Sequence, residues 1–188
     1  LLDVDELVVV VDHNDDLLTS LRARFSSDQS AVTVVASAGP RGLSGARNTG
    51  TREARGDILV FIDDDEIPSP GWLKALVSTW RAQGCAAVTG PTPPTFEVDP
   101  SAWVVASGAF DSWEAADGAQ VRSADTGNLL LDLAVVERLG LRFDPRYGLT
   151  GGEDSLFTRQ LTRAGGVIRF AAGAVVTKRV PAARALSL

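Results

Sequence analysis

A five-residue apolar run followed at once by acidic residues constrains this chain most. Residues 58–62 read ILVFI and residues 63–66 read DDDE. Five apolar residues between polar turns are too few for a helix, and they predict a strand that is buried on both faces of a sheet. Open α/β sheets bind ligands at the carboxyl ends of their strands, so we expect the acidic residues at such an edge.

The spacing of the acids suggests a metal site. Side chains alternate along an extended chain, so Asp63 and Asp65 are predicted to point one way and Asp64 the other. Crowded carboxylates repel one another unless a proton or a cation intervenes. Mg²⁺ or Mn²⁺ would suit such a pair, and these ions keep coordination positions open for substrate phosphates. From the spacing alone, an acidic turn that caps the next helix is an equal alternative.

Four motifs stand in an order that resembles glycosyltransferase family 2, whose members have the nucleotide-sugar-binding fold called GT-A. Residues 61–65 (FIDDD) look like the family's Asp-X-Asp signature. The other three matches are residues 45–50 (GARNTG), which resemble its Arg-Asn segment, residues 126–132 (TGNLLLD), which resemble the strand beside its acceptor site, and residues 151–154 (GGED), which resemble its Glu-Asp motif. The resemblance extends from about residue 7 to residue 170.

The resemblance implies an α/β fold, a GT-A (Rossmann-like) three-layer α/β/α domain over residues 1–188 with a mainly parallel mixed sheet. Apolar runs that alternate with amphipathic helices support it. Nothing matches the family's first strand and helix, so we expect a single domain truncated at its amino terminus, with truncation at the carboxyl terminus left open. The strands expected to share one sheet lie near residues 7–12, 32–36, 58–62, 86–89 and 128–131.

The resemblance also implies site residues. Asp154 would be the catalytic base, and Asp63 and Asp65 would hold the metal. Residues implied to bind the nucleotide or the substrate are Asp12, Arg47, Asn48, Asp63, Asp64, Asn128 and Glu153.

Several of these roles have structural alternatives. Arg47 could be a surface arginine on a tightly packed helix. Glu153 and Asp154 could simply be carboxylates stabilised by a helix amino terminus.

The chain departs from the family pattern at two places. His13 follows Asp12 where relatives have a second acid. Lys178 and Arg179 lie near the last strand, where many relatives have a histidine. Either basic residue could neutralise a diphosphate, or the two could be a surface pair.

The implied function is metal-dependent transfer of a sugar, with inversion, from a nucleotide-diphosphate sugar to an acceptor hydroxyl. A UDP-sugar is the expected donor, and the acceptor could be a saccharide, a lipid-linked saccharide or a small molecule. Transfer is expected to be non-processive, because Arg163 is followed by Ala164 instead of the tryptophan of processive synthases. A sugar nucleotidyltransferase and a non-catalytic domain that binds nucleotide or a partner protein are the alternatives.

Composition narrows the class of protein. The chain has 188 residues, 45% of them hydrophobic and 22% charged, as in ordinary soluble domains. A net charge of −6 argues against a nucleic-acid partner. Cys85 is the only cysteine, and no apolar run approaches the length of a membrane span. We therefore expect a cytoplasmic protein without a transmembrane segment.

Overall fold

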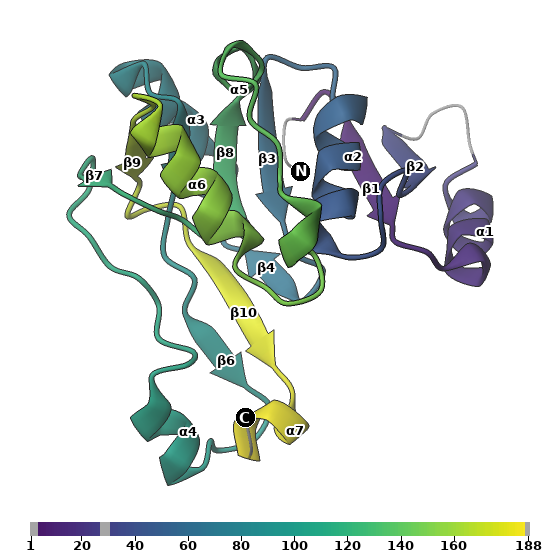
Figure 1. Ribbon diagram of the computed structural model, residues 1–188. Helices are drawn as coiled ribbons and strands as arrows, with labels where there is room; N and C mark the ends of the chain where they lie inside the picture. Colours follow the sequence, from purple (N-terminus) through teal and green to yellow (C-terminus); the bar gives the residue numbers. More distant parts are fainter. Residues whose placement is uncertain (1–3, 27–30, 187–188) are drawn as a thin grey trace. The chain divides into compact units, whose positions relative to one another are not determined.

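The computed structural model describes residues 4–26 and 31–186, and the chain divides into two compact units. The first comprises residues 1–59 and 132–165, and the second comprises residues 60–131 and 166–188. Figure 1 labels the elements of both.

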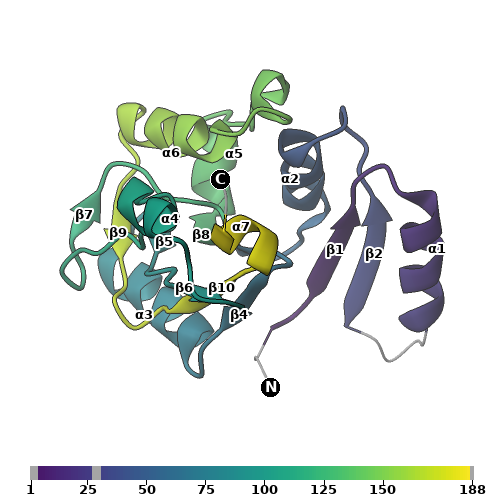
Figure 2. The same ribbon diagram turned by 90° about the horizontal axis from the view of Figure 1, so that it is seen from below.

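The first unit is built on a pair of parallel strands, β1 and β2, in register from Leu7 opposite Val32 to Val11 opposite Ala36. Helix α1 packs against β2, and α2 packs against β1 (Figure 2). The elements of this unit are β1 (Leu7–Val11), α1 (Asp15–Arg24), β2 (Val32–Ala36), α2 (Leu43–Glu53), α5 (Leu133–Arg138), the 3-10 helix η1 (Pro145–Tyr147) and α6 (Glu153–Arg163).

The second unit holds a five-stranded sheet in the order β3-β8-β5-β9-β7 and a three-stranded sheet in the order β4-β10-β6. Strand β3 begins in the first unit and ends in the second. The elements are β3 (Ile58–Ile62), β4 (Glu66–Pro68), α3 (Trp72–Gln83), β5 (Ala87–Thr89), β6 (Pro94–Phe96), α4 (Ala102–Ser107), β7 (Gln120–Val121), β8 (Asn128–Asp132), β9 (Ile168–Phe170), β10 (Val176–Val180) and α7 (Ala182–Leu186).

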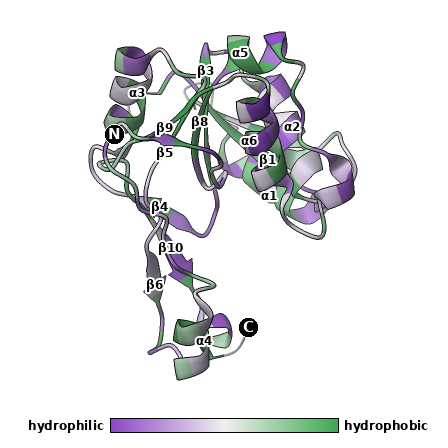
Figure 3. Ribbon diagram, turned by 60° about the vertical axis from the view of Figure 1, so that its left-hand side comes forward, coloured by the Kyte–Doolittle hydropathy of each residue, from purple (hydrophilic) through white to green (hydrophobic). Residues whose placement is uncertain are grey.

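The larger sheet is mixed. Strand β5 pairs parallel with β9 and antiparallel with β8, and β7 pairs antiparallel with β9. Figure 3 shows the hydrophobic character of these central strands, and their side chains form the core of the unit. Helix α3 packs on β5 and buries Trp72 and Leu76.

Two expectations about the sheet are corrected. The predicted strands all form, but β1 and β2 make a sheet of their own instead of joining β3, β5 and β8. Strand β3 is half-buried, with Ile62 exposed, because it lies at the edge of its sheet. An apolar run predicts that a strand forms. Which strands lie beside it in the sheet depends on pairings between distant segments of the chain.

Candidate functional site

Three carboxylates gather at the turn that follows β3. Asp63, Asp65 and Glu66 each offer an oxygen, and these oxygens lie within 4.8 Å of one another. The turn is closed by the Glu66 N–H, which donates to the Asp63 carbonyl at 3.2 Å. In return, the Asp63 N–H donates to Glu66 Oε2 at 3.3 Å. Carboxylate oxygens are hard ligands, so this acidic triad fits Mg²⁺ or Mn²⁺.

The triad differs in one member from the predicted site. Asp63 and Asp65 come together, as their spacing suggested, and Asp64 is exposed and outside the triad. Glu66 was missed, although it is the next residue in the same acidic run. Alternation along a strand predicts directions only while the chain stays extended, and here a turn brings Glu66 back to Asp63.

Lys178 of β10 is the cation beside the triad. Its Nζ lies 3.4 Å from Asp65 Oδ1, 3.4 Å from Glu66 Oε1 and 3.7 Å from Asp63 Oδ2. Its neighbour Arg179 instead pairs with Glu97, at 3.1 Å between Nη2 and Oε1. Of the two basic residues near the last strand, Lys178 is therefore the one at the acidic triad.

The pKa values around the triad indicate an excess of negative charge. Burial raises the pKa of Glu66, the nearby charge of Asp63 adds to the rise, and together they outweigh Lys178. Burial on its own lowers the pKa of Lys178, but the charges of Glu66, Asp63 and Asp65 raise it overall. Crowded carboxylates beside a single ammonium favour added positive charge, as a divalent cation would supply.

Gly127 makes room for the buried Glu66 side chain. A Cβ built at Gly127 would lie 2.3 Å from Glu66 Oε1, so only glycine lets the carboxylate approach the backbone there. The next residue, Asn128, is buried and accepts a hydrogen bond from Trp72 Nε1 at 2.8 Å. Its Nδ2 donates to the carbonyls of Ala174 (2.7 Å) and Pro91 (3.3 Å). Asn128 thus links buried groups of the second unit by hydrogen bonds. Its binding of substrate stays a prediction.

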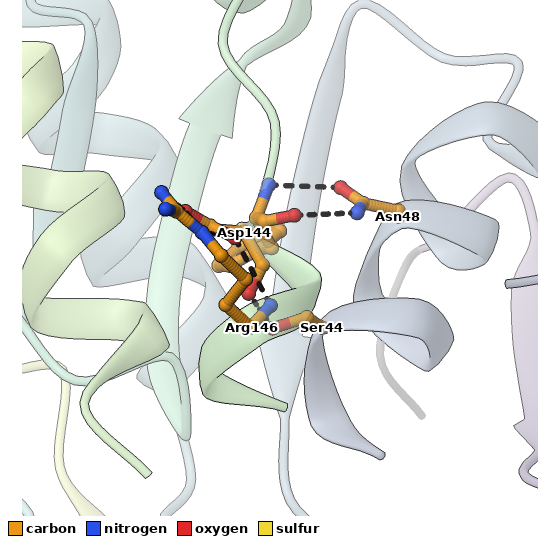
Figure 4. A network of polar contacts seen from close by, with 5 residues as sticks. Ser44, Asn48, Asp144 and Arg146 are labelled. Atoms are coloured by element: carbon orange, nitrogen blue, oxygen red, sulfur yellow. Dashed lines mark hydrogen bonds and ion pairs between the residues drawn. The ribbon is translucent and has the colours of Figure 1, made fainter. Parts of the chain in front are cut away.

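In the first unit, α2 holds the segment that leads to α6 (Figure 4). Asn48 Nδ2 donates to the Phe143 carbonyl at 2.8 Å, and Asn48 Oδ1 accepts from the Phe143 N–H at 2.9 Å. One turn earlier on α2, Ser44 Oγ donates to the Asp144 carbonyl at 2.8 Å. The asparagine of the GARNTG motif therefore fixes a loop backbone much as a neighbouring strand would.

Arg47 forms an ion pair with Glu153 in the interior of the same unit. The side chains are 10% and 2% exposed, respectively. The guanidinium carbon also lies 5.8 Å from the centre of the Phe143 ring, which stacks on Phe157 at 4.2 Å between ring centres. The two motif residues thus neutralise one another and join α2 to the start of α6. A grip of Arg47 on a diphosphate stays a prediction.

Asp154 lies in the first turn of α6, beside the paired Glu153. Its Oδ1 accepts a hydrogen bond from the Ser155 N–H at 2.6 Å, and its side chain is partly exposed. Gly151 and Gly152 precede it with φ of 79° and 87°, and apart from each glycine's chain neighbours no atom of the described residues lies within 4 Å of a Cβ built at either. The two glycines that precede this aspartate therefore have no close neighbours in the fold at their Cβ positions.

Asp12 fixes the turn before α2. Its Oδ2 accepts from the Gly42 N–H at 2.8 Å, and its Oδ1 lies 2.8 Å from His13 Nδ1. Burial raises the pKa of Asp12, but its contacts with His13 and Gly42 lower it overall. Of the predicted site residues, Asp12, Arg47, Asn48, Glu153 and Asp154 lie in the first unit, whereas Asp63, Asp64, Asp65 and Asn128 lie in the second.

The family model described as "Glycosyl transferase family 2" matches residues 2–129. The chain belongs to this family. "Succinoglycan biosynthesis protein ExoM" of Rhizobium meliloti is 40% identical over 147 residues, which cover 76% of this chain and 46% of that protein. "Glycosyltransferase AglE" of Haloferax volcanii is 30% identical over 169 residues, which cover 88% and 54%. The chain spans about half the length of these relatives.

Solved structures confirm the GT-A fold of this family 2 chain. The crystal structure of GalNAc-T7 with UDP, GalNAc and Mn²⁺ aligns with a TM-score of 0.72 at 16% identity, covering 94% of this chain and 38% of that one. S. aureus TarS in complex with UDP-GlcNAc aligns with a TM-score of 0.66 at 16% identity, covering 93% and 49%. Among residues 4–26 and 31–186, no helix is long and apolar enough to cross a bilayer.

Proposed function

We propose that this chain carries out metal-dependent transfer of a sugar from a nucleotide-diphosphate donor to an acceptor hydroxyl, with inversion at the anomeric carbon. The observation that carries the proposal is the acidic triad of Asp63, Asp65 and Glu66 at the family's Asp-X-Asp signature. A UDP-sugar is the proposed donor, because the solved structures of GalNAc-T7 and TarS hold UDP and UDP-GlcNAc, respectively.

The roles of the acids follow from their chemistry. Asp63, Asp65 and Glu66 would hold Mn²⁺ or Mg²⁺, which stabilises the departing diphosphate when it is bound. Asp154 would accept the proton of the acceptor hydroxyl while the hydroxyl oxygen attacks the anomeric carbon and the bond to the diphosphate breaks. Asp154 is partly exposed, so its carboxylate is accessible to such an acceptor.

Two aspartate variants with matched controls test the proposal. Asp65→Asn removes a charge with little change of shape, so manganese-dependent binding of UDP should weaken sharply in calorimetry. Asp57→Asn, an exposed acid before β3, is its control and should bind UDP normally. Unchanged manganese-dependent affinity in Asp65→Asn would mean that the acidic run is only a turn.

Asp154→Asn should lower the transfer rate by about 10²–10⁴-fold while UDP affinity stays near that of the wild type, because a general base acts in the chemical step. Asp16→Asn, an exposed acid in the first turn of α1, controls for the loss of a charge at a helix amino terminus. A screen of nucleotide sugars supplies the donor for these assays. Near-normal transfer by Asp154→Asn would place the base elsewhere.

A further inference from the structure

The lysine beside the acidic triad is placed by strand register. Strands β4 and β10 lie side by side (Figure 1) and pair antiparallel. Their register sets Lys178 directly opposite Glu66. Directly opposed residues of an antiparallel pair project on the same face, so the register brings the ammonium to the carboxylates. Main-chain bonds hold both sides: the Lys178 N–H donates to the Pro93 carbonyl (3.0 Å), and the Arg179 N–H donates to the Asp65 carbonyl (2.9 Å).

The ammonium of Lys178 lies where a bound cation would contact all three carboxylates. Its distances to their oxygens are 3.4–3.7 Å, so one positive charge faces three negative ones. The backbone of Lys178 is held by these hydrogen bonds. Its side chain is flexible and 28% exposed, so the ammonium can move toward solvent. The charge at the triad is therefore held in place by attraction alone and can be displaced.

We propose that Lys178 is the built-in counter-ion of the acidic triad, which a divalent cation must displace, and that it thereby sets the metal affinity of the site. The inference rests on the proposed function, because the metal is the one assigned there to Asp63, Asp65 and Glu66. Mg²⁺ binds carboxylate oxygens at about 2.0–2.1 Å. A divalent ion on these oxygens would face a like charge at close range if the ammonium stayed.

Two consequences follow for the protein. In the metal-free protein, Lys178 relieves the repulsion among three crowded carboxylates and so stabilises the turn after β3. At limiting metal, the same charge keeps the site from holding its cation tightly, so metal occupancy would follow the supply of metal. Lys178 thus lowers the affinity of the site for metal and raises the stability of the metal-free protein.

Calorimetric titration with Mn²⁺ in the absence of donor tests the inference. Lys178→Met keeps an unbranched stem of similar length without the charge and should bind Mn²⁺ at least about tenfold more tightly than the wild type, since a close like charge is removed. Lys178→Gln is a second neutral variant and should behave likewise. Lys178→Arg keeps the charge and should stay near wild-type affinity. Arg179→Gln is the matched control, because Arg179 is 61% exposed and pairs with Glu97 instead.

Thermal unfolding provides a readout that a purely structural lysine would not produce. Without metal, Lys178→Met should unfold at a lower temperature than the wild type. The same excess of Mn²⁺ should raise its unfolding temperature by more than it raises that of the wild type, because the stabilisation by a ligand grows with the logarithm of its concentration divided by its Kd for the folded state.

The outcomes separate this inference from the proposed function. Unchanged or weaker Mn²⁺ binding in both neutral variants would overturn it, and so would an equal gain in Arg179→Gln. If no variant binds Mn²⁺ while sugar transfer proceeds in EDTA, the inference is wrong and transfer survives without its metal. Tighter Mn²⁺ binding in the neutral variants, with no transfer from any donor, would support the inference and remove the proposed function.

Discussion

Removing the guanidinium of Arg47 should destabilise the chain more than a typical point mutation. The partner, Glu153, is 2% exposed, and its Oε2 has no hydrogen-bond partner among the residues that the structure describes. Arg47→Met would leave this carboxylate buried without its counter-charge. Breaking a buried ion pair in this way costs about 3–5 kcal/mol. Since whole domains are stable by about 5–15 kcal/mol, this loss should be plain in equilibrium unfolding.

A double-mutant cycle isolates the pair. Glu153→Leu removes the buried charge, so Arg47→Met combined with Glu153→Leu should recover much of the stability lost in Arg47→Met alone. We expect a coupling free energy of about 2 kcal/mol or more from urea denaturation of the four proteins. Loss of the helix amino-terminal charge contributes only about 0.3–1 kcal/mol, which is too little to explain such coupling.

The chain supplies its own control pair. Arg52 and Glu53 are neighbours on the same helix, with side chains 56% and 40% exposed and 3.1 Å between Nη2 and Oε1. The same cycle at this exposed pair should give about 0.2–1 kcal/mol. Because the chain has two compact units, each transition must first be shown to be two-state. If the couplings of the two pairs differ by less than about 0.5 kcal/mol, burial of the Arg47–Glu153 pair does not matter and the reasoning fails.

Two further predictions concern Gly127 and Asp12. Gly127→Ala should cost roughly 1–3 kcal/mol of stability and weaken Mn²⁺ binding, because its Cβ would displace the Glu66 carboxylate. Gly56→Ala is the control, because a Cβ built at Gly56 lies 3.5 Å from the closest atom of the Ile58 backbone. Equal effects in both variants would contradict the prediction. Burial raises the pKa of Asp12, but its contacts with His13 and Gly42 lower it below 3.8 overall, so its ionised form stabilises the fold. The stability of the wild type relative to Asp12→Asn should therefore be full above about pH 4 and should decline as the pH falls through the lowered pKa; urea denaturation from about pH 6 to pH 3 measures it, and a relative stability that grows on acidification would refute it.

Local sequence patterns predicted which strands form better than they predicted which strands pair with one another. The apolar run at residues 58–62 is strand β3, and the strands expected near residues 7–12 and 32–36 are β1 and β2. Their signals lie within a few neighbouring residues. The pairing of β4 with β10 joins segments more than 100 residues apart, and the three residues of β4 carry no pattern of their own. Register of this kind depends on tertiary packing, which a local pattern does not encode.

The same limit applied to the site. Sequence spacing predicted that Asp63 and Asp65 lie together. The contacts of Glu66 with Lys178 and of Arg47 with Glu153 join segments that are far apart in the sequence and meet only in the folded chain. A motif match gives each residue a family role one at a time. It cannot show that two motif residues, Arg47 and Glu153, neutralise each other.

Exposure and hydrogen bonding now separate the motif residues into two kinds. Asn128 uses both its Nδ2 hydrogens and its Oδ1 on protein groups, and Asn48 bonds both atoms of its amide to the Phe143 backbone. A side chain whose polar groups are satisfied inside the protein gains little from a substrate and loses much if removed. Asp65 and Asp154 are partly exposed carboxylates with lone pairs to spare. Variants of the asparagines should therefore act first on stability, whereas variants of these two aspartates should act first on binding and rate.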